Sequence, residues 1–333
     1  MSLFAKQNMN MTKLNVIGKI QEIISCYLYD CLRYIKYSAT FRSKGNKTIL
    51  MAHITRLYHS IEKGMALPSP RIGFGRKIAF ELIRLIEYYT DKYGIEQINC
   101  IAFNVLCKYM EFNKSAGLDD PDMEKLIIRM EEILDRSCED YKEGGIVILK
   151  RSEILEEVNG GFEQLVLSRH SIRMFEKRTI DREMIEKAVE IAIHTPSVCN
   201  RQCWRVHCYS EPERCAELIN IQGGGRGFAE AAKYVLIVTA NLNVFWPARE
   251  RNQPFVDGGM FGMSLNYALH SLGLGTCCLN LAFSKKKEEV FRMYAAIPKW
   301  ESFIFMIAVG HIPEKIRVTA STRKKVNECL TIH

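Results

Sequence analysis

The segment Arg169–Arg173 places two guanidinium groups, an imidazole and a hydroxyl within five residues. Guanidinium groups stay charged at any working pH and bind phosphate through paired hydrogen bonds, and the Ser171 hydroxyl adds a further donor. A second basic cluster, Arg323-Lys324-Lys325, lies near the C-terminus. Each cluster alone is also compatible with a solvated charged segment. Taken together, they predict one buried phosphate site.

Two further segments carry groups that suit a planar heterocycle. In residues 194–204, Asn200 and Gln202 offer amide donors and acceptors beside a Pro196-Ser197 turn. An ordinary helix-to-strand loop is the alternative. In residues 256–280, the small residues Gly258, Gly259, Gly262 and Ser264 allow a helix to approach a flat group or another helix closely.

The pair Cys277–Cys278 follows a Gly-Leu-Gly-Thr turn, whose glycines tolerate unusual backbone angles. One interpretation is a redox-active thiol pair beside a ligand. The other is two small strand residues on opposite faces of a sheet, which is the interpretation we favour.

Helices and strands must position these segments. Hydrophobic patterns predict strands over 203–209, 233–240, 275–281 and 303–309, with helices near 162–168, 258–272 and 285–294. Asp181 is expected to cap another helix, with an inner face of Met184, Ile185, Ala188, Ile191 and Ala192. Strands separated by helices indicate a layered α/β or α+β sheet domain.

The first 150 residues are predicted to be mostly helical. Expected helices cover 14–37, 49–63, 77–93 and 96–112, and another runs from Pro121 to about Tyr141. A loop rich in proline and glycine is expected over 65–75. His59 and Glu62 share one helix face at i, i+3, and this face either reaches toward a site or belongs to a capped helix end. We therefore divide the chain into 1–150, of unknown role, and 151–333.

Composition narrows the function classes. The chain of 333 residues is 47% hydrophobic and 25% charged, with a net charge of +8 and no block of about five or six like charges. This argues against a disordered protein and against a nucleic-acid partner. The apolar runs are too short for a membrane helix. The 12 cysteines show neither a CxxC pair nor zinc spacing, so we expect reduced thiols, no metal and a cytoplasmic protein.

In their order along the chain, these segments resemble the motifs of the nitroreductase family of FMN-dependent flavoproteins. An opening Arg-Arg/His-Ser-x-Arg/Lys-x-Phe motif is similar to residues 169–175, and Pro-Ser-x-x-Asn-x-Gln-Pro-Trp is similar to 196–204, with Cys203 in place of proline. Asp257-Gly258-Gly259 with the Leu-Gly-Leu-Gly-Thr of 272–276 resembles the third motif. Arg323-Lys324-Lys325-Val326 resembles the closing one, with Lys325 in place of proline.

The resemblance, over about residues 160–333, implies a three-layer α+β fold with a central mixed sheet flanked by helices, plus the N-terminal mainly helical region. It implies an obligate homodimer with FMN at the subunit interface. Arg169 and Arg323 would hold the phosphate. The other implied cofactor-binding residues are His170, Ser171, Arg173, Pro196, Ser197, Asn200, Gln202, Cys277, Cys278 and Leu279. No side chain is assigned a catalytic role, because the flavin carries the redox step.

The implied activity is an NAD(P)H-dependent FMN oxidoreductase. By this resemblance NAD(P)H reduces FMN, and a small acceptor such as a nitro compound or a quinone then takes the electrons in a ping-pong cycle. The alternative is a flavin-binding or flavin-free scaffold that keeps the fold. Residues 59–75 faintly resemble an extension on nitroreductase-like proteins of polysaccharide-synthesis gene clusters, so such a scaffold could serve polysaccharide synthesis.

Overall fold

The computed structural model describes residues 3–37, 46–134, 138, 143–245 and 248–333. The N-terminal part is helical, with α1 (Leu3–Tyr37), α2 (Lys47–Met65), α3 (Arg76–Tyr93), α4 (Gln97–Ser115) and α5 (Pro121–Leu134). Helices α2 to α5 pack around one apolar core that includes Ile54, Ile61, Leu82, Ile86, Leu106 and Met130. The first 150 residues are therefore mainly helical, as predicted.

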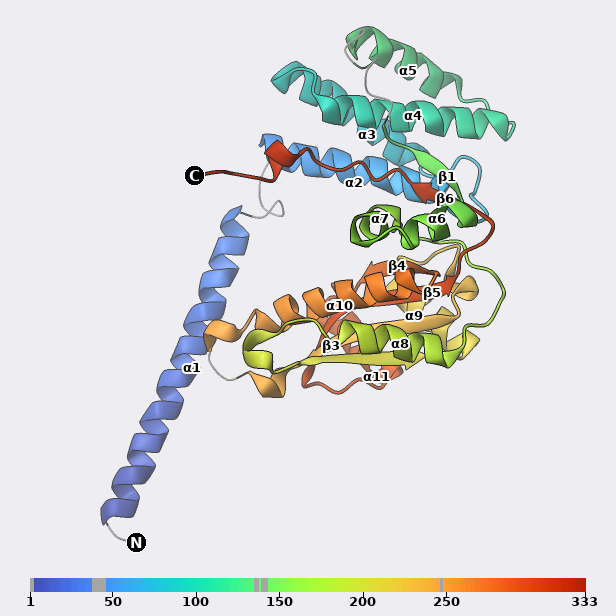
Figure 1. Cartoon of the computed structure of the whole chain (residues 1–333). Coiled ribbons are helices and arrows are strands. Elements are labelled where there is room, and N and C mark those ends of the chain that lie inside the picture. Colours follow the sequence, from blue (N-terminus) through green and yellow to red (C-terminus); the bar gives the residue numbers. More distant parts are fainter. Residues whose placement is uncertain (1–2, 38–45, 135–137, 139–142, 246–247) are drawn as a thin grey trace.

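Helix α1 extends away from the rest of the molecule (Figure 1). Arg251 holds it through an ion pair, with Nε 2.7 Å from Oδ2 of Asp30. Its apolar side chains face solvent with exposed fractions of 43–60%, and they are Val16, Ile17, Ile20, Ile23, Ile24, Tyr27, Leu28, Tyr29, Leu32 and Ile35. Among the described residues, no helix combines the length and the apolar character that crossing a membrane requires.

A short antiparallel ribbon joins the two parts of the chain. Strand β1 (Ile146–Lys150) pairs with β6 (Lys315–Thr319), with Ile146 opposite Thr319. Between these strands in sequence come α6 (Arg151–Val158), α7 (Phe162–Ser168) and the rest of the sheet domain. Sequence patterns did not indicate either ribbon strand, because each is only five residues long.

The main sheet has four strands in the order β2-β3-β5-β4. They are β2 (Trp204–Tyr209), β3 (Tyr234–Asn241), β5 (Glu301–His311) and β4 (Leu274–Asn280), and all three pairings are antiparallel. An isolated parallel bridge joins Ser171 to Thr276 of β4, so this edge of the sheet has both parallel and antiparallel pairing. The four strands coincide with the predicted ones to within two residues at each end.

Helices cover both faces of this sheet (Figure 1). On one face α8 (Arg182–Ala192) and α10 (Gln253–Ser271) enclose a core with Leu236, Phe261 and Ile307. On the other face α9 (Pro212–Gln222) and α11 (Lys285–Ala295) enclose a second core. The domain is therefore the expected three-layer α+β fold.

Glycines let α10 lie close to β5. A Cβ atom on Gly258 would lie 2.6 Å from Ile304, and one on Gly262 would lie 2.4 Å from Phe305, whereas one on Gly259 would meet nothing within 4 Å. Gly258 and Gly262 thus allow α10 to pack closely on the sheet, while the position of Gly259 has free space around it.

Some local expectations need correction. Asp181 precedes α8, but its side chain makes no capping hydrogen bond, and Ile191 is 42% exposed instead of buried. Helix α5 is described only to Leu134, so the expected continuation to Tyr141 falls mostly outside the described residues.

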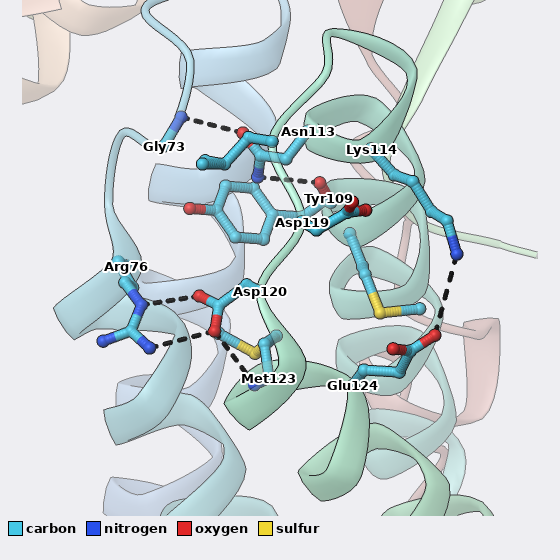
Figure 2. Close-up of a pocket in the computed structure, with 11 residues that line it drawn as sticks. Gly73, Arg76, Tyr109, Asn113, Lys114, Asp119, Asp120, Met123 and Glu124 are labelled. Atoms are coloured by element: carbon cyan, nitrogen blue, oxygen red, sulfur yellow. Dashed lines mark hydrogen bonds and ion pairs between the residues drawn. The ribbon is translucent and has the colours of Figure 1, made fainter.

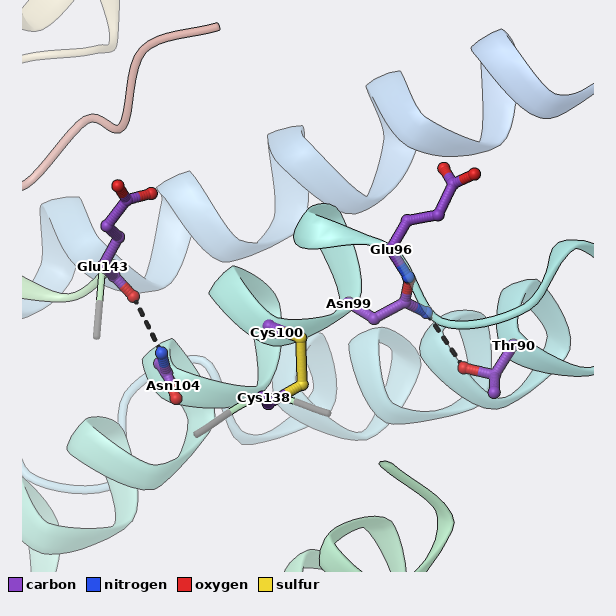
Figure 3. Close-up of a disulfide and its surroundings, with 7 residues drawn as sticks. All are labelled: Thr90, Glu96, Asn99, Cys100, Asn104, Cys138 and Glu143. Atoms are coloured by element: carbon purple, nitrogen blue, oxygen red, sulfur yellow. Dashed lines mark hydrogen bonds between the residues drawn. A yellow bond between two sulfur atoms is a disulfide. The ribbon is translucent and has the colours of Figure 1, made fainter. Parts of the chain in front are cut away.

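The expectation of reduced cysteines is wrong at one pair. Cys100 of α4 and Cys138 form a disulfide (Figure 3). Near it, Asn104 donates a hydrogen bond to the carbonyl of Glu143 over 3.1 Å. Their separation of 38 residues gave no spacing signal, because a disulfide depends on where the fold brings two chain segments. Disulfides are typical of oxidising compartments, so the cysteines no longer support the cytoplasm, which stays a prediction.

Candidate functional site

The two predicted basic clusters line one open cavity of about 650 Å³. Arg169 and His170 enter it directly after α7, and Arg323 enters it from the C-terminal segment after β6. Met263 and Tyr267 of α10 form an apolar wall. The fold therefore brings together Arg169 and Arg323 from opposite ends of the domain, as the sequence predicted.

The N-terminal region also contributes to this cavity. Lys108 of α4 lines it, and its Nζ donates to the carbonyl of Gly144 over 2.6 Å. Glu143, which precedes β1, forms part of the same wall, and so does Val147 of β1. No motif in the sequence connected these residues with the site, because they come from outside the region of family resemblance.

Positive charge dominates the cavity. Burial, Arg169 and Arg323 together hold the pKa of His170 below its usual value. Burial and the charges of Arg169 and His170 lower the pKa of His270 to about 4, and this ring accepts or donates a 2.9 Å hydrogen bond with Ser168. Within the described residues, no carboxylate lies at ion-pair distance from Arg169 or Arg323. The cavity wall also contains the acid Glu143, whose carboxylate accepts a hydrogen bond from Gln97 Nε2 over 3.1 Å instead of pairing with either arginine.

The segment Arg169–Arg173 then runs along the edge of the sheet. Ile172 N donates to the carbonyl of Thr276 over 2.8 Å, which fixes the segment against β4. Arg173 is 8% exposed, and its Nη1 donates to the carbonyl of Ser171 over 3.3 Å. The predicted residues Arg169, His170, Ser171 and Arg173 are therefore held beside the strand that carries Cys277–Leu279.

The two strand cysteines face opposite sides of the sheet. Cys277 is fully buried and Cys278 is exposed. Burial is the main reason that the pKa of the Cys277 thiol is raised. Since the thiolate is the reactive form of cysteine, this environment argues against an activated thiol pair and for the simpler of the two interpretations.

The loop Pro196–Gln202 is strained and firmly held. Cys199, Asn200 and Gln202 have φ values of 47°, 54° and 46°, a left-handed conformation that is costly for residues other than glycine. The fully buried Asp257 accepts a hydrogen bond from the Val198 backbone over 3.2 Å. This arrangement leaves the side chains of Asn200 and Gln202 exposed. Strain of this kind is found at ligand-binding loops.

The loop does not line the cavity of Arg169 and Arg323. Asp257, which holds the loop, lies at the N-terminal end of α10, and His270, which contacts Ser168, lies at its C-terminal end. With a rise of 1.5 Å per residue, these positions are about 20 Å apart. One chain thus presents the two predicted sets of ligand-binding residues at opposite ends of the same helix.

A separate small cavity of about 30 Å³ lies between α3, α4 and α5 (Figure 2). The Arg76 guanidinium pairs with Asp120 over 2.5 Å and 2.9 Å, and Asn113 accepts from the Gly73 backbone over 2.8 Å. It has room for water but not for an organic ligand. Among the described residues no cluster suits a metal ion.

The sheet domain is similar to a known protein family and to several solved structures. The family model described as "Nitroreductase family" matches residues 166–221 and 209–311. A nitroreductase family protein from Streptococcus pneumoniae has a similar solved structure, with 22% identity and a TM-score of 0.44. That match covers 52% of this chain and 100% of the other. A putative nitroreductase in complex with FMN from Desulfovibrio desulfuricans also gives 22% identity and a TM-score of 0.44, over 51% and 95% of the two chains.

A putative NADH dehydrogenase/NAD(P)H nitroreductase from Parabacteroides distasonis is 18% identical, with a TM-score of 0.44 over 51% of this chain and 96% of the other. Among curated protein sequences, none matches this chain significantly. The family model covers α8 to α11 and the whole four-stranded sheet. Residues 166–311 of this chain therefore match the nitroreductase family.

Proposed function

We propose that this chain is an FMN-dependent oxidoreductase that takes hydride from NAD(P)H and passes it to a small organic acceptor. The observation that carries the proposal is the cavity of about 650 Å³ lined by Arg169, His170 and Arg323 in a nitroreductase-family domain. Arginines without an ion-pair partner among the described residues fit a phosphate, because guanidinium groups bind phosphate through paired hydrogen bonds. The site offers one such cluster, which favours FMN over a dinucleotide flavin.

Each segment has a proposed role toward that cofactor. Arg169, His170 and Arg323 bind the phosphate, while Ser171 and Arg173 contact the ribityl chain or the pyrimidine edge. The backbone of Cys277, Cys278 and Leu279 lies beside the ring. When bound, FMN supplies hydride acceptance and donation. The protein positions the cofactor and, because burial raises the pKa of Cys277, keeps a neutral thiol next to it.

A homodimer would unite the two separated sets of residues. In a two-fold symmetric pair, the loop of one chain reaches the cavity of the other, and the same contact is made twice. Pro196, Ser197, Asn200 and Gln202 of one chain would then line the flavin held by Arg169 and Arg323 of its partner. The strained, outward-facing loop supports this arrangement, since the side-chain amides of Asn200 and Gln202 are exposed and bond to each other over 3.2 Å.

We keep the division into residues 1–150 and 151–333 as a proposal, with the β1–β6 ribbon joining the two units. The exposed apolar side of α1 favours a second candidate function, a scaffold or interaction protein with a nitroreductase fold.

The visible absorbance spectrum of the purified protein separates the two functions. An oxidoreductase is expected to be yellow, or to become so when FMN is added, and to oxidise NADH or NADPH in the presence of a quinone or nitroaromatic acceptor. A protein that is colourless after incubation with excess FMN and removal of the free FMN contradicts the proposed function. A yellow protein that oxidises neither nicotinamide supports the flavin-binding scaffold.

A further inference from the structure

One side of α4 holds the residues that lead into β1. Four side chains follow one another along this helix at spacings of three or four residues, which places them on the same face, and they are Gln97, Cys100, Asn104 and Lys108. Cys100 forms the disulfide with Cys138 (Figure 3). Asn104 donates to the Glu143 carbonyl over 3.1 Å, and Lys108 Nζ donates to the Gly144 carbonyl over 2.6 Å. This face of α4 therefore fixes Cys138, Glu143 and Gly144 in place.

The chain before β1 fits tightly against both α4 and α2. Gly144 has a φ of 100°, and a Cβ atom there would lie 2.9 Å from the Ile101 carbonyl oxygen. The next residue, Gly145, donates its N–H to the fully buried Glu62 carboxylate of α2 over 2.9 Å. Glu62 also contacts His59 Nδ1 over 3.2 Å. The His59 and Glu62 pair expected from the sequence thus ties α2 to the residue that precedes β1.

Glu143 brings a carboxylate into the cavity wall. It lines the cavity together with Arg169 and Arg323. Its side chain is exposed and accepts a hydrogen bond from Gln97 Nε2 over 3.1 Å. A guanidinium attracts a carboxylate across a few ångströms, and the carboxylate then occupies the same N–H donors that a phosphate needs. The position of Glu143 therefore decides whether the arginines are available to a phosphate.

The disulfide offers one of its sulfur atoms to an external thiol. Cys100 is fully buried, whereas Cys138 is partly exposed. Exchange starts when a thiolate attacks an accessible sulfur. The first thiolate of a dithiol bonds to Cys138 Sγ, and the bond to Cys100 Sγ breaks, so that Cys100 leaves as a thiolate and takes up a proton. The second thiol of the reductant then displaces Cys138, which leaves two thiols on the protein and a disulfide in the oxidised reductant.

We propose that the Cys100–Cys138 disulfide is a thiol–disulfide exchange site that controls how tightly the cavity binds the flavin phosphate, by holding Glu143 away from Arg169 and Arg323. This rests on the proposed function. With the disulfide formed, the chain before β1 is tied to α4 by a covalent bond as well as by hydrogen bonds. After reduction, hydrogen bonds alone hold Glu143 against the attraction of the arginines. The carboxylate then competes with the phosphate, and the affinity for the cofactor falls.

The test measures the affinity of FMN for the apo chain before and after reduction by dithiothreitol, with the reductant removed under nitrogen. The oxidised chain is expected to bind FMN about tenfold more tightly than the reduced chain, within the usual range of coupling between two sites. Such coupling is reciprocal, so saturating FMN should shift the exchange equilibrium with dithiothreitol about tenfold, or about 30 mV, toward the protein disulfide. A disulfide that serves folding alone would show neither shift.

Three variants locate the effect. Glu143→Gln removes the competing charge and should bind FMN equally in the two redox states. The double variant Cys100→Ser/Cys138→Ser should bind FMN like the reduced wild type, with or without dithiothreitol. Cys107→Ser is the matched control, because this free thiol lies on the same helix outside the disulfide, and it should retain the full difference between the two states.

Equal affinities of the oxidised and the reduced wild-type chain, with native helix content by circular dichroism, would overturn the inference and leave the proposed function intact. This comparison needs no substitution, so it stands even where a serine variant does not fold. A redox difference that persists in Glu143→Gln would also overturn the inference, since the effect would then not come from this acid. A wild-type chain that binds no FMN in either redox state would overturn both the inference and the proposed function.

Discussion

Arg169 is the residue on which the electrostatics of the site depend most. Its charge contributes to the lowered pKa values of both His170 and His270, and it has no carboxylate partner among the described residues. Burial is the larger cause for both rings, and together with the Arg169 charge it favours the neutral imidazole. The result is a cavity in which the arginines supply the charge and the imidazoles supply hydrogen bonds.

Replacing Arg169 or Arg323 by alanine is expected to weaken FMN binding. Each change removes charge-assisted hydrogen bonds worth about 1.5–3 kcal/mol, or about 10- to 150-fold in affinity. The loss should be larger for Arg169, which is half-buried, than for Arg323, which is exposed in the single chain. Fluorescence titration of the apo protein measures both.

The double variant is expected to lose less than the sum of the single losses, because both arginines act on one group. Lys324→Ala is the control, since this neighbouring side chain is exposed, and it should change the binding free energy by less than about 1 kcal/mol. Full flavin occupancy of both arginine variants would show that the phosphate does not bind at these positions.

His270 makes stability depend on pH. Its pKa is about 4 in the folded chain and about 6.5 when unfolded. Between these values the unfolded chain binds a proton that the native chain does not, so the free energy of unfolding falls as pH drops from about 6.5 to about 4. The loss from this group is at most about 3 kcal/mol.

Urea unfolding of the apo protein across this pH range measures the effect. His270→Gln should flatten the pH dependence, whereas His194→Gln, at an exposed site, should retain it. An unchanged slope in His270→Gln would contradict the assignment of a buried neutral imidazole.

Among the elements, α10 organises the site because it contacts both sets of ligand-binding residues. Asp257 near its start holds the strained loop, Met263 and Tyr267 wall the cavity, and His270 near its end contacts Ser168. The helix can do this only by lying very close to β5, which requires glycine at positions 258 and 262.

Gly262→Ala is therefore expected to destabilise the protein by about 1–3 kcal/mol, because the new methyl group would overlap Phe305. Gly259→Ala adds the same methyl to the same helix where nothing lies within 4 Å, and it should be neutral or stabilising by up to about 1 kcal/mol. Thermal unfolding of the two variants gives the comparison. Equal destabilisation of both would contradict the close approach of α10 to β5.

The disulfide between α4 and Cys138 makes a prediction about thiol number. Of the 12 cysteines, ten are free, so thiol titration of the denatured, unreduced protein should find ten. Closing a loop of 38 residues stabilises a chain by about 4 kcal/mol in the chain-entropy model, so reduction should lower the denaturation midpoint. Cys107→Ser is the control for loss of a cysteine that is not in the disulfide, since Cys107 is a free thiol on the same helix. A count of twelve would contradict the pairing.

The whole molecule shows which features local sequence could predict. The four main strands and α7 were predicted closely, because hydrophobic runs with turn signals at both ends decide them locally. Arg169, Arg323 and the strained loop were also recognised as candidates from their motifs. The β1–β6 ribbon, the disulfide and the contribution of Lys108 were not recognised, since each depends on contacts between distant segments. Ile191 was predicted to be buried but is 42% exposed, whereas its neighbour Ala192 is fully buried.

Assembly is the property of the whole molecule that the proposed function requires. A single chain places Arg169 and the Asn200–Gln202 loop at opposite ends of α10, and it leaves ten apolar side chains of α1 exposed. Two copies in a symmetric pair would build two complete flavin sites.

Analytical ultracentrifugation of the purified protein, recorded at the visible flavin absorbance, tests whether two chains build the flavin site. We predict that the flavin sediments with a species of twice the 38.3 kDa chain mass, and that the released cofactor is FMN by mass spectrometry. Flavin that sediments with a 38.3 kDa monomer, or FAD as the main released species, would contradict it.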